Sequence, residues 1–122
     1  MTLKRFEKGN KGAGGNGYDA RFSGQIVAIV QRNEVTFTTS LLNALGSPKF
    51  VGVYTDSIEW ALKAESNRAD GYTVANRTKG LTSKYLACGK FVRDEKIPVG
   101  YYYIGRIENG MVIFSKTPSG QV

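Results

Sequence analysis

From residue 21 onward, short apolar segments rich in β-branched residues alternate with turn residues along the chain. Residues 22–32, FSGQIVAIVQR, predict a first strand, and the alternating VTFTT of residues 35–39 predicts a second. Asn33 lies between them and favours a tight turn. The pattern therefore predicts an antiparallel hairpin at the start of the folded region.

A short helix is predicted directly after this hairpin. Residues 39–46, TSLLNALG, combine a Thr or Ser cap with spaced leucines and a terminal glycine. Pro48 follows two residues later and cannot continue a helix. The helix is only two turns long, so it depends on tertiary packing for its stability.

A second hairpin is predicted from residues 49–55, KFVGVYT, and residues 58–64, IEWALKA. The pair turns at Asp56-Ser57. Because side chains alternate along a strand, Ile58, Trp60 and Leu62 share one face, which we expect to lie in the core.

The last third of the chain repeats this order of helix and hairpin. Its pattern predicts a strand at residues 71–77 and a turn at Lys79-Gly80. A second short helix is predicted from Thr82-Ser83 through Tyr85 and Leu86. A hairpin of residues 101–107 and 111–116 follows and turns at Asn109-Gly110. Setting TSKYLACG, residues 82–89, beside TSLLNALG aligns the two helices and predicts an internal duplication.

These elements predict a single α+β, β-dominated domain over residues 21–117. We expect about seven strands and two short helices, closed as a barrel or arranged as a strongly curved sheet, because open edges of this composition would aggregate. Residues 1–20 are rich in Gly and Lys and predict a flexible basic arm. Residues 118–122 are expected to form a short tail.

Residues 35–64 resemble the swapped-hairpin DNA-binding domains of the AbrB and MazE kind. In that family a strand leads into a short helix ending at Gly, then a strand, an acidic turn and a strand closing on a basic residue. In this sequence the five places are occupied, in that order, by residues 35–38, 41–46, 50–54, Asp56 and residues 58–63. Residues 82–116 resemble a second copy, which implies a fused pseudo-dimer that binds duplex DNA. The family's proline at the helix start is replaced by Thr39 or Ser40, and no DNA-contacting residue is carried over.

A fainter likeness, in size, basic charge and aromatic strands, is to the small single-stranded-DNA-binding proteins of bacteriophages.

Charge adds a candidate partner. The chain has 17 Lys and Arg against 10 Asp and Glu, a net charge of +7 and a pI near 9.6, which is typical of proteins that bind polyanions. The arm and its junction carry Lys4, Arg5, Lys8, Lys11 and Arg21. A second basic stretch without acidic residues contains Arg77, Lys79, Lys84, Lys90 and Arg93. Such a run is also compatible with an ordinary solvated surface.

The tyrosines of residues 101–103 supply the other candidate feature. Strand alternation puts Tyr101 and Tyr103 on one face and Tyr102 and Arg106 on the other. Exposed aromatic rings near cations offer stacking surfaces to unpaired bases, and Tyr54 is a further candidate. The alternative is that these tyrosines complete the core and keep only their hydroxyl groups in water.

No catalytic constellation emerges from the sequence. There is no histidine, and the single Cys88 is expected to be a small buried core residue. The glycines of residues 12–17 match a dinucleotide-loop spacing, but no strand precedes them. Asp94-Glu95-Lys96, with Asp70 upstream, resembles part of a metal-dependent nuclease site, although a charged loop explains the same residues. We therefore expect no enzyme activity, no cofactor and no bound metal.

Together these features predict a non-catalytic nucleic-acid-binding protein. Single-stranded DNA is favoured, with phosphates held by the basic residues, among them Arg106, and bases stacked on Tyr54, Tyr101 and Tyr103. One alternative is an AbrB-like regulator that binds duplex DNA, and another is a phage or bacterial protein-interaction or virion-associated module. We expect a homo-oligomer, with a dimer as the simplest case. The single cysteine and the lack of a long apolar segment predict a cytoplasmic protein with no membrane association.

Overall fold

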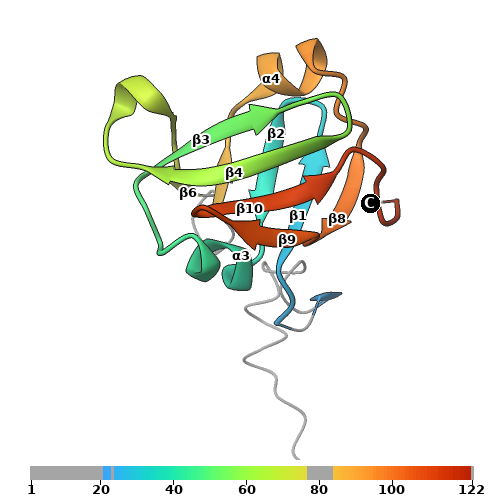
Figure 1. Ribbon diagram of the computed structural model, residues 1–122, viewed down its shortest axis with the longest axis horizontal. Helices are drawn as coiled ribbons and strands as arrows, with labels where there is room; N and C mark the ends of the chain where they lie inside the picture. The colour runs from blue at the N-terminus through green and yellow to red at the C-terminus, as the bar shows by residue number, and fades with distance from the viewer. Residues whose placement is uncertain (1–20, 23, 77–83, 122) are drawn as a thin grey trace, which may run out of the picture.

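The protein forms two antiparallel β-sheets with short helices at their ends (Figure 1). The computed structural model describes residues 21–22, 24–76 and 84–121. Within these ranges the elements are β1 (Val27–Gln31), β2 (Glu34–Phe37), α3 (Thr39–Ala44), β3 (Phe50–Thr55), β4 (Glu59–Glu65), the 3-10 helix η2 (Arg68–Asp70), β5 (Tyr72–Thr73), β6 (Ala75–Asn76), β7 (Lys84–Leu86), α4 (Gly89–Asp94), β8 (Gly100–Tyr103), β9 (Arg106–Glu108) and β10 (Met111–Ser115).

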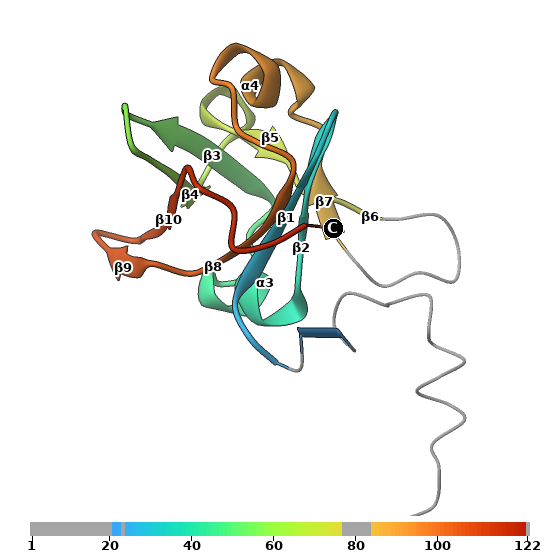
Figure 2. The same cartoon turned by 90° about the vertical axis from the view of Figure 1, so that its right-hand side faces the viewer.

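The strands divide into two five-stranded layers, seen side by side in Figure 2. Sheet A has the order β6-β7-β2-β1-β8, and sheet B has the order β5-β3-β4-β10-β9. The two hairpins predicted at the start of the domain are both present: Val30 pairs with Val35 in sheet A, and Tyr54 pairs with Ala61 in sheet B. The fold is therefore β-dominated, as the sequence predicts.

The core lies between the two sheets and is built around Trp60. This side chain is 1% exposed, and its ring stacks on Phe114 at a centroid distance of 4.6 Å. Tyr102 of sheet A meets the same indole edge-to-face at 5.3 Å, and Phe91 of α4 approaches it at 6.3 Å. Aromatic rings from both layers and from one helix thus meet at one residue, which couples the elements energetically.

The described residues contain ten strands where the sequence predicts seven. The predicted strand 71–77 is divided at Val74 into β5 and β6, which belong to different sheets. The predicted strand 101–107 is divided in the same way at Ile104 and Gly105, and β7 is the tenth strand. Among the described residues the pairing leaves each sheet open rather than closing a barrel. Hydrophobic alternation continues across both divisions, so it gives no sign that the chain changes sheet.

The predicted second helix is wrong over its described residues. Lys84–Leu86 is strand β7, and the helix α4 follows at Gly89–Asp94, mostly beyond the predicted helix segment 82–89. The cause is tertiary: Leu86 pairs with Val35 of β2 and is buried, whereas Phe91 and Val92 supply the buried face of α4. Sheet pairing overrides the local cap signal.

The predicted core position of Ile58 is also wrong. Its side chain is 69% exposed beside the β3–β4 turn.

Several helices and strands of the two halves recur at a spacing different from the predicted one. Helices α3 and α4 start 50 positions apart, at Thr39 and Gly89, and so do strands β2 and β7. Leu62 pairs directly with Val112, 50 positions later, in the antiparallel ladder of β4 and β10. Leu62 and Val112 are therefore equivalent positions of the two halves. When equivalent residues pair in an antiparallel ladder, a pseudo-two-fold axis passes between them. Helices α3 and α4 accordingly lie at opposite ends of the molecule (Figure 1).

Thr38 joins the first helix to the first hairpin. Its hydroxyl accepts the Leu41 N–H at 3.2 Å as the cap of α3, and it also accepts the Val27 N–H at 3.2 Å. The same hydroxyl donates to the Gln25 carbonyl at 2.9 Å. Thr38 is 2% exposed, so water cannot replace these bonds.

We predict that Thr38→Val lowers the free energy of unfolding by about 1–3 kcal/mol, because the isosteric side chain leaves buried backbone groups without partners. Urea unfolding followed by the fluorescence of Trp60, the single tryptophan, measures this change. Thr38→Ser keeps the hydroxyl and is the matched control, with an expected loss of about 1 kcal/mol for the missing methyl group. Equal losses in the two variants would show that the hydroxyl network is not the cause.

Candidate nucleic-acid interface

Strand β8 presents the tyrosines as the alternation predicts. Tyr102 points into the core with 1% exposure, and its hydroxyl donates a hydrogen bond to the Pro98 carbonyl. Burial raises the pKa of this phenol above its usual value. Tyr101 and Tyr103 point to the opposite side, which is the outer face of sheet A.

The two outward tyrosines form an aromatic cluster with Arg21 and Phe22. The Phe22 ring meets Tyr101 edge-to-face at 5.0 Å and Tyr103 at 6.2 Å, and the two tyrosine rings are 5.5 Å apart. The Arg21 guanidinium lies 5.3 Å from the ring centres of both Phe22 and Tyr101. Arg21 is exposed and donates a hydrogen bond to the Gln121 carbonyl, a neutral acceptor, so its positive charge is not compensated there.

The C-terminal residues cover part of this cluster. Tyr101 donates its backbone N–H to the Gly120 carbonyl at 2.9 Å, and Ser119 donates back to the Tyr101 carbonyl at 2.8 Å. The segment predicted to be a tail therefore pairs with the edge of sheet A. A Cβ atom at Gly120 would lie 2.3 Å from the Tyr101 ring, so the ring packs directly on the glycine backbone. Tyr103 is 42% exposed and is the accessible ring of the cluster.

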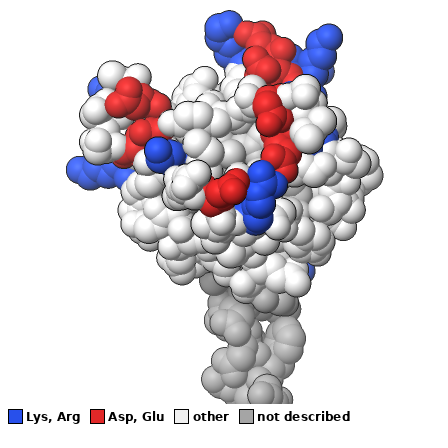
Figure 3. Space-filling view, in the orientation of Figure 1, with Lys and Arg blue, Asp and Glu red and all other residues white. Residues whose placement is uncertain are grey.

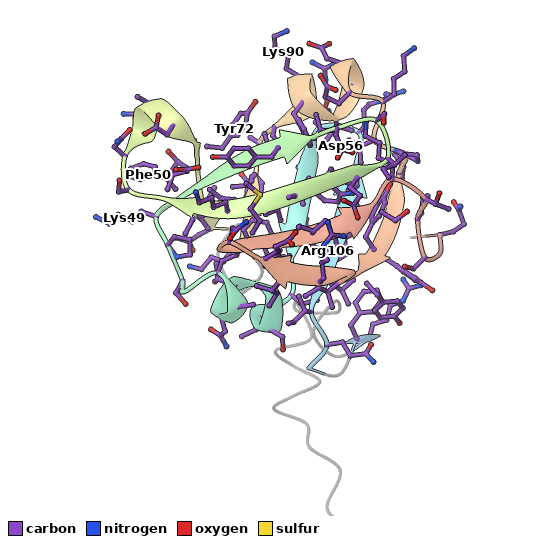
Figure 4. All side chains as sticks on the ribbon, in the orientation of Figure 1. Lys49, Phe50, Asp56, Tyr72, Lys90 and Arg106 are labelled. Atoms are coloured by element: carbon purple, nitrogen blue, oxygen red, sulfur yellow. The ribbon has the colours of Figure 1, made fainter. Side chains whose placement is uncertain are left out.

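Tyr54 lies elsewhere, on the outer face of sheet B. Arg106 lies on the same face (Figure 4). The Tyr54 hydroxyl donates to the Glu65 carboxylate, and this bond raises the pKa of the phenol. Arg106 donates to both carboxylate oxygens of Glu59, at 2.5 and 3.0 Å, and to Glu108 at 3.3 Å. These bonds raise the pKa of the guanidinium and compensate its charge. The structure therefore does not bring Tyr54 or Arg106 together with the aromatic cluster.

The face of sheet B carries mixed charge. In Figure 3 acidic side chains alternate with basic ones along its margins, and no continuous basic track is visible on this face. At the β3–β4 turn, Asp56 accepts the backbone N–H groups of Ile58 and Glu59 at 2.8 and 2.7 Å, which lowers the pKa of its carboxyl. This turn has a structural role that explains the acidic residue there.

The predicted basic stretch is divided by its partners. Lys90 forms an ion pair with Asp94 at 2.6 Å, which raises the pKa of the lysine and lowers that of the aspartate. Arg93 donates to the Asn33 side-chain oxygen at 3.0 Å, and Lys84 donates to the side-chain oxygen of Asn76. Amide partners leave the positive charge uncompensated, so Arg93 and Lys84 stay available to an anion and Lys90 does not.

The remaining predicted contacts lie outside the described residues, namely Lys4, Arg5, Lys8, Lys11, Arg77 and Lys79. The described residues hold eleven Lys and Arg against eight Asp and Glu, which is +3 of the chain's net charge of +7. More than half of the net charge is therefore carried by the other residues.

Two observations on the described residues concern metal ligation and the single cysteine. It contains no group of three or more Cys, Asp, Glu or His residues suited to a metal ion. Cys88 is 1% exposed, and burial raises the pKa of its thiol to about 12. Within the same residues, no helix combines the length and apolar character needed to cross a bilayer.

Two parts of the site were not anticipated from the sequence. Phe22 was assigned to a strand, and the contact of Gly120 with Tyr101 was not foreseen because residues 118–122 were treated as a tail. The only sign in the sequence that Phe22 belongs to the aromatic cluster is its position next to Arg21. Comparison with known proteins finds no matching family model, curated protein or solved structure.

We predict that Cys88 in the folded protein resists alkylation by iodoacetamide at pH 8. The thiolate is the reactive form, and a pKa of about 12 keeps the buried thiol protonated there. Because the folded pKa lies above that of an unfolded thiol, this contribution to stability is present below about pH 8.5 and is lost as the pH rises. Mass spectrometry with and without urea measures the labelling, and rapid labelling without urea would contradict the burial.

Proposed function

We propose that this protein binds nucleic acid without catalysing a reaction, and that its preferred ligand is single-stranded DNA. The observation that carries the proposal is the aromatic cluster: an exposed Tyr103 beside Tyr101 and Phe22, with the guanidinium of Arg21, which has no carboxylate partner among the described residues, over the rings. Unpaired bases stack on aromatic side chains, and cations next to those rings hold the phosphates.

The placement of charge supports the same proposal. Arg21 is the first described residue, and Lys4, Arg5, Lys8 and Lys11 of the predicted arm precede it in the sequence. A ligand strand stacked on Tyr103 would therefore lie beside the residue from which the predicted basic arm extends. Phosphate contacts of this kind make binding weaken as salt is added.

The test is fluorescence anisotropy with a labelled single-stranded oligonucleotide across a salt series. We predict that Tyr103→Ala weakens binding about 5- to 150-fold, the equivalent of the roughly 1–3 kcal/mol that base–aromatic stacking contributes. Arg21→Gln is expected to weaken binding and to reduce its salt dependence.

Tyr54→Ala is the matched control, because Tyr54 has a similar exposure, 37%, on the other sheet. It is expected to leave the affinity unchanged. Equal losses from Tyr54→Ala and Tyr103→Ala would contradict a site at the aromatic cluster. A folded protein that binds no oligonucleotide at low salt would overturn the proposed function and favour a protein-interaction module instead.

Duplex DNA is the second candidate, supported by the pseudo-two-fold pairing of Leu62 with Val112 and by the turn at Asp56. An internally paired two-copy unit is what a fused swapped-hairpin dimer would have. A duplex bound at least tenfold more tightly than the single strand, with no loss on Tyr103→Ala, would favour this candidate. Sedimentation of the complex would also test whether the chain acts as a homo-oligomer.

A further inference from the structure

A hollow of about 350 Å³ lies at the end of sheet A farthest from the aromatic cluster. One wall comes from α3 and the loop after it. The other wall comes from β6, from Val74 directly before β6, and from β7. Its lining residues are Leu42, Ser47, Pro48, Lys49, Val74, Asn76 and Lys84. We refer to it as the lysine groove. Figure 4 shows Lys49 at the margin of the molecule, where its side chain extends away from the sheets.

The lysine groove has two ammonium groups and no acidic residue in its lining. None of the ion pairs among the described residues involves Lys49 or Lys84. The Lys84 amine donates to the side-chain oxygen of Asn76, which fixes the amide so that its NH₂ group is the end left to donate. Two cations and an amide donor around one hollow match the chemistry of a phosphate group.

Lys49 and Lys84 contrast with Lys90 and Arg106, which are held by carboxylates that compensate their charges. Lys49 and Lys84 come from different elements, the α3–β3 loop and β7, and line the same hollow because the strands of sheet A bring β7 beside β2. The groove is therefore a product of the fold and not of a basic run in the sequence.

We propose that the lysine groove binds a backbone phosphate of the same nucleic-acid strand that stacks on Tyr103. This inference rests on the proposed function. Four strand spacings separate β8 from β6 in sheet A, which is about 19 Å at roughly 4.8 Å per strand. Lys84 is in register with the core-facing Phe37, so the groove opens at the β6–β7 edge of sheet A, and a strand that connects the two sites passes around this edge from the outer face.

The experiment compares the salt dependence of single-stranded DNA binding for Lys49→Gln, Lys84→Gln and the double variant. Each lost phosphate contact lowers the slope of log affinity against log salt by about 0.7 on a single strand, so the double variant is expected to lose about 1.4. Glutamine at residue 84 keeps a polar end group for Asn76. Trp60 fluorescence in urea verifies folding, and Lys49→Gln alone suffices as a test because Lys49 is exposed.

Lys116→Gln is the control, because it removes the same charge near Asp56 of sheet B. It is expected to leave the slope unchanged. An unchanged slope in the double variant, or an equal decrease in Lys116→Gln, would overturn the lysine groove while leaving the proposed function in place. Failure of the unmodified protein to bind would overturn both, whereas loss in Tyr103→Ala without loss in the lysine variants would overturn the groove alone.

Discussion

Tyr102 sets the geometry on which the binding face depends. Its ring is inserted between the sheets, edge-to-face with Trp60, and its exposure is 1%. A strand has a side-chain period of two, so burial of the middle tyrosine forces Tyr101 and Tyr103 to the outer face. A shift of β8 by one residue would bury two tyrosines and expose one, at the cost of the Trp60 contact. The core packing thus determines which rings a ligand can reach.

The two sheets differ in how their cations are paired. On sheet B, Glu59 and Glu108 hold Arg106, so this cation is paired. On sheet A, the cations near the cluster and the groove, Arg21 and Lys84, have neutral oxygen partners. Among the described residues a phosphate has no bound carboxylate to displace there, and for that reason we place the nucleic acid on sheet A.

The sequence predicted well those features that depend on local pattern. The alternation of residues 101–103, the turn at Asn109-Gly110 and the burial of Trp60 and Cys88 all follow from side-chain period, turn chemistry or residue type. The compensation of Arg106 by Glu59 could not be predicted, because the two residues are 47 positions apart and meet only through β10. The same reason applies to the strand Lys84–Leu86, whose partner is β2, and to the meeting of Lys49 with Lys84.

The internal repeat explains why only one half of the protein carries an outward aromatic pair. Strands β3 and β8 start 50 positions apart, yet Val51 faces the core and Tyr101, 50 positions later, faces outward. The two loops before them differ in backbone conformation: Gly46 and Ser47 have positive φ after α3, whereas Lys96 and Gly100 do after α4. A strand that enters its sheet one position out of phase presents every side chain on the opposite face. The outward tyrosines therefore accompany a different connection after α4, and the two-fold relation that organises the core is broken at the strand to which we assign the ligand.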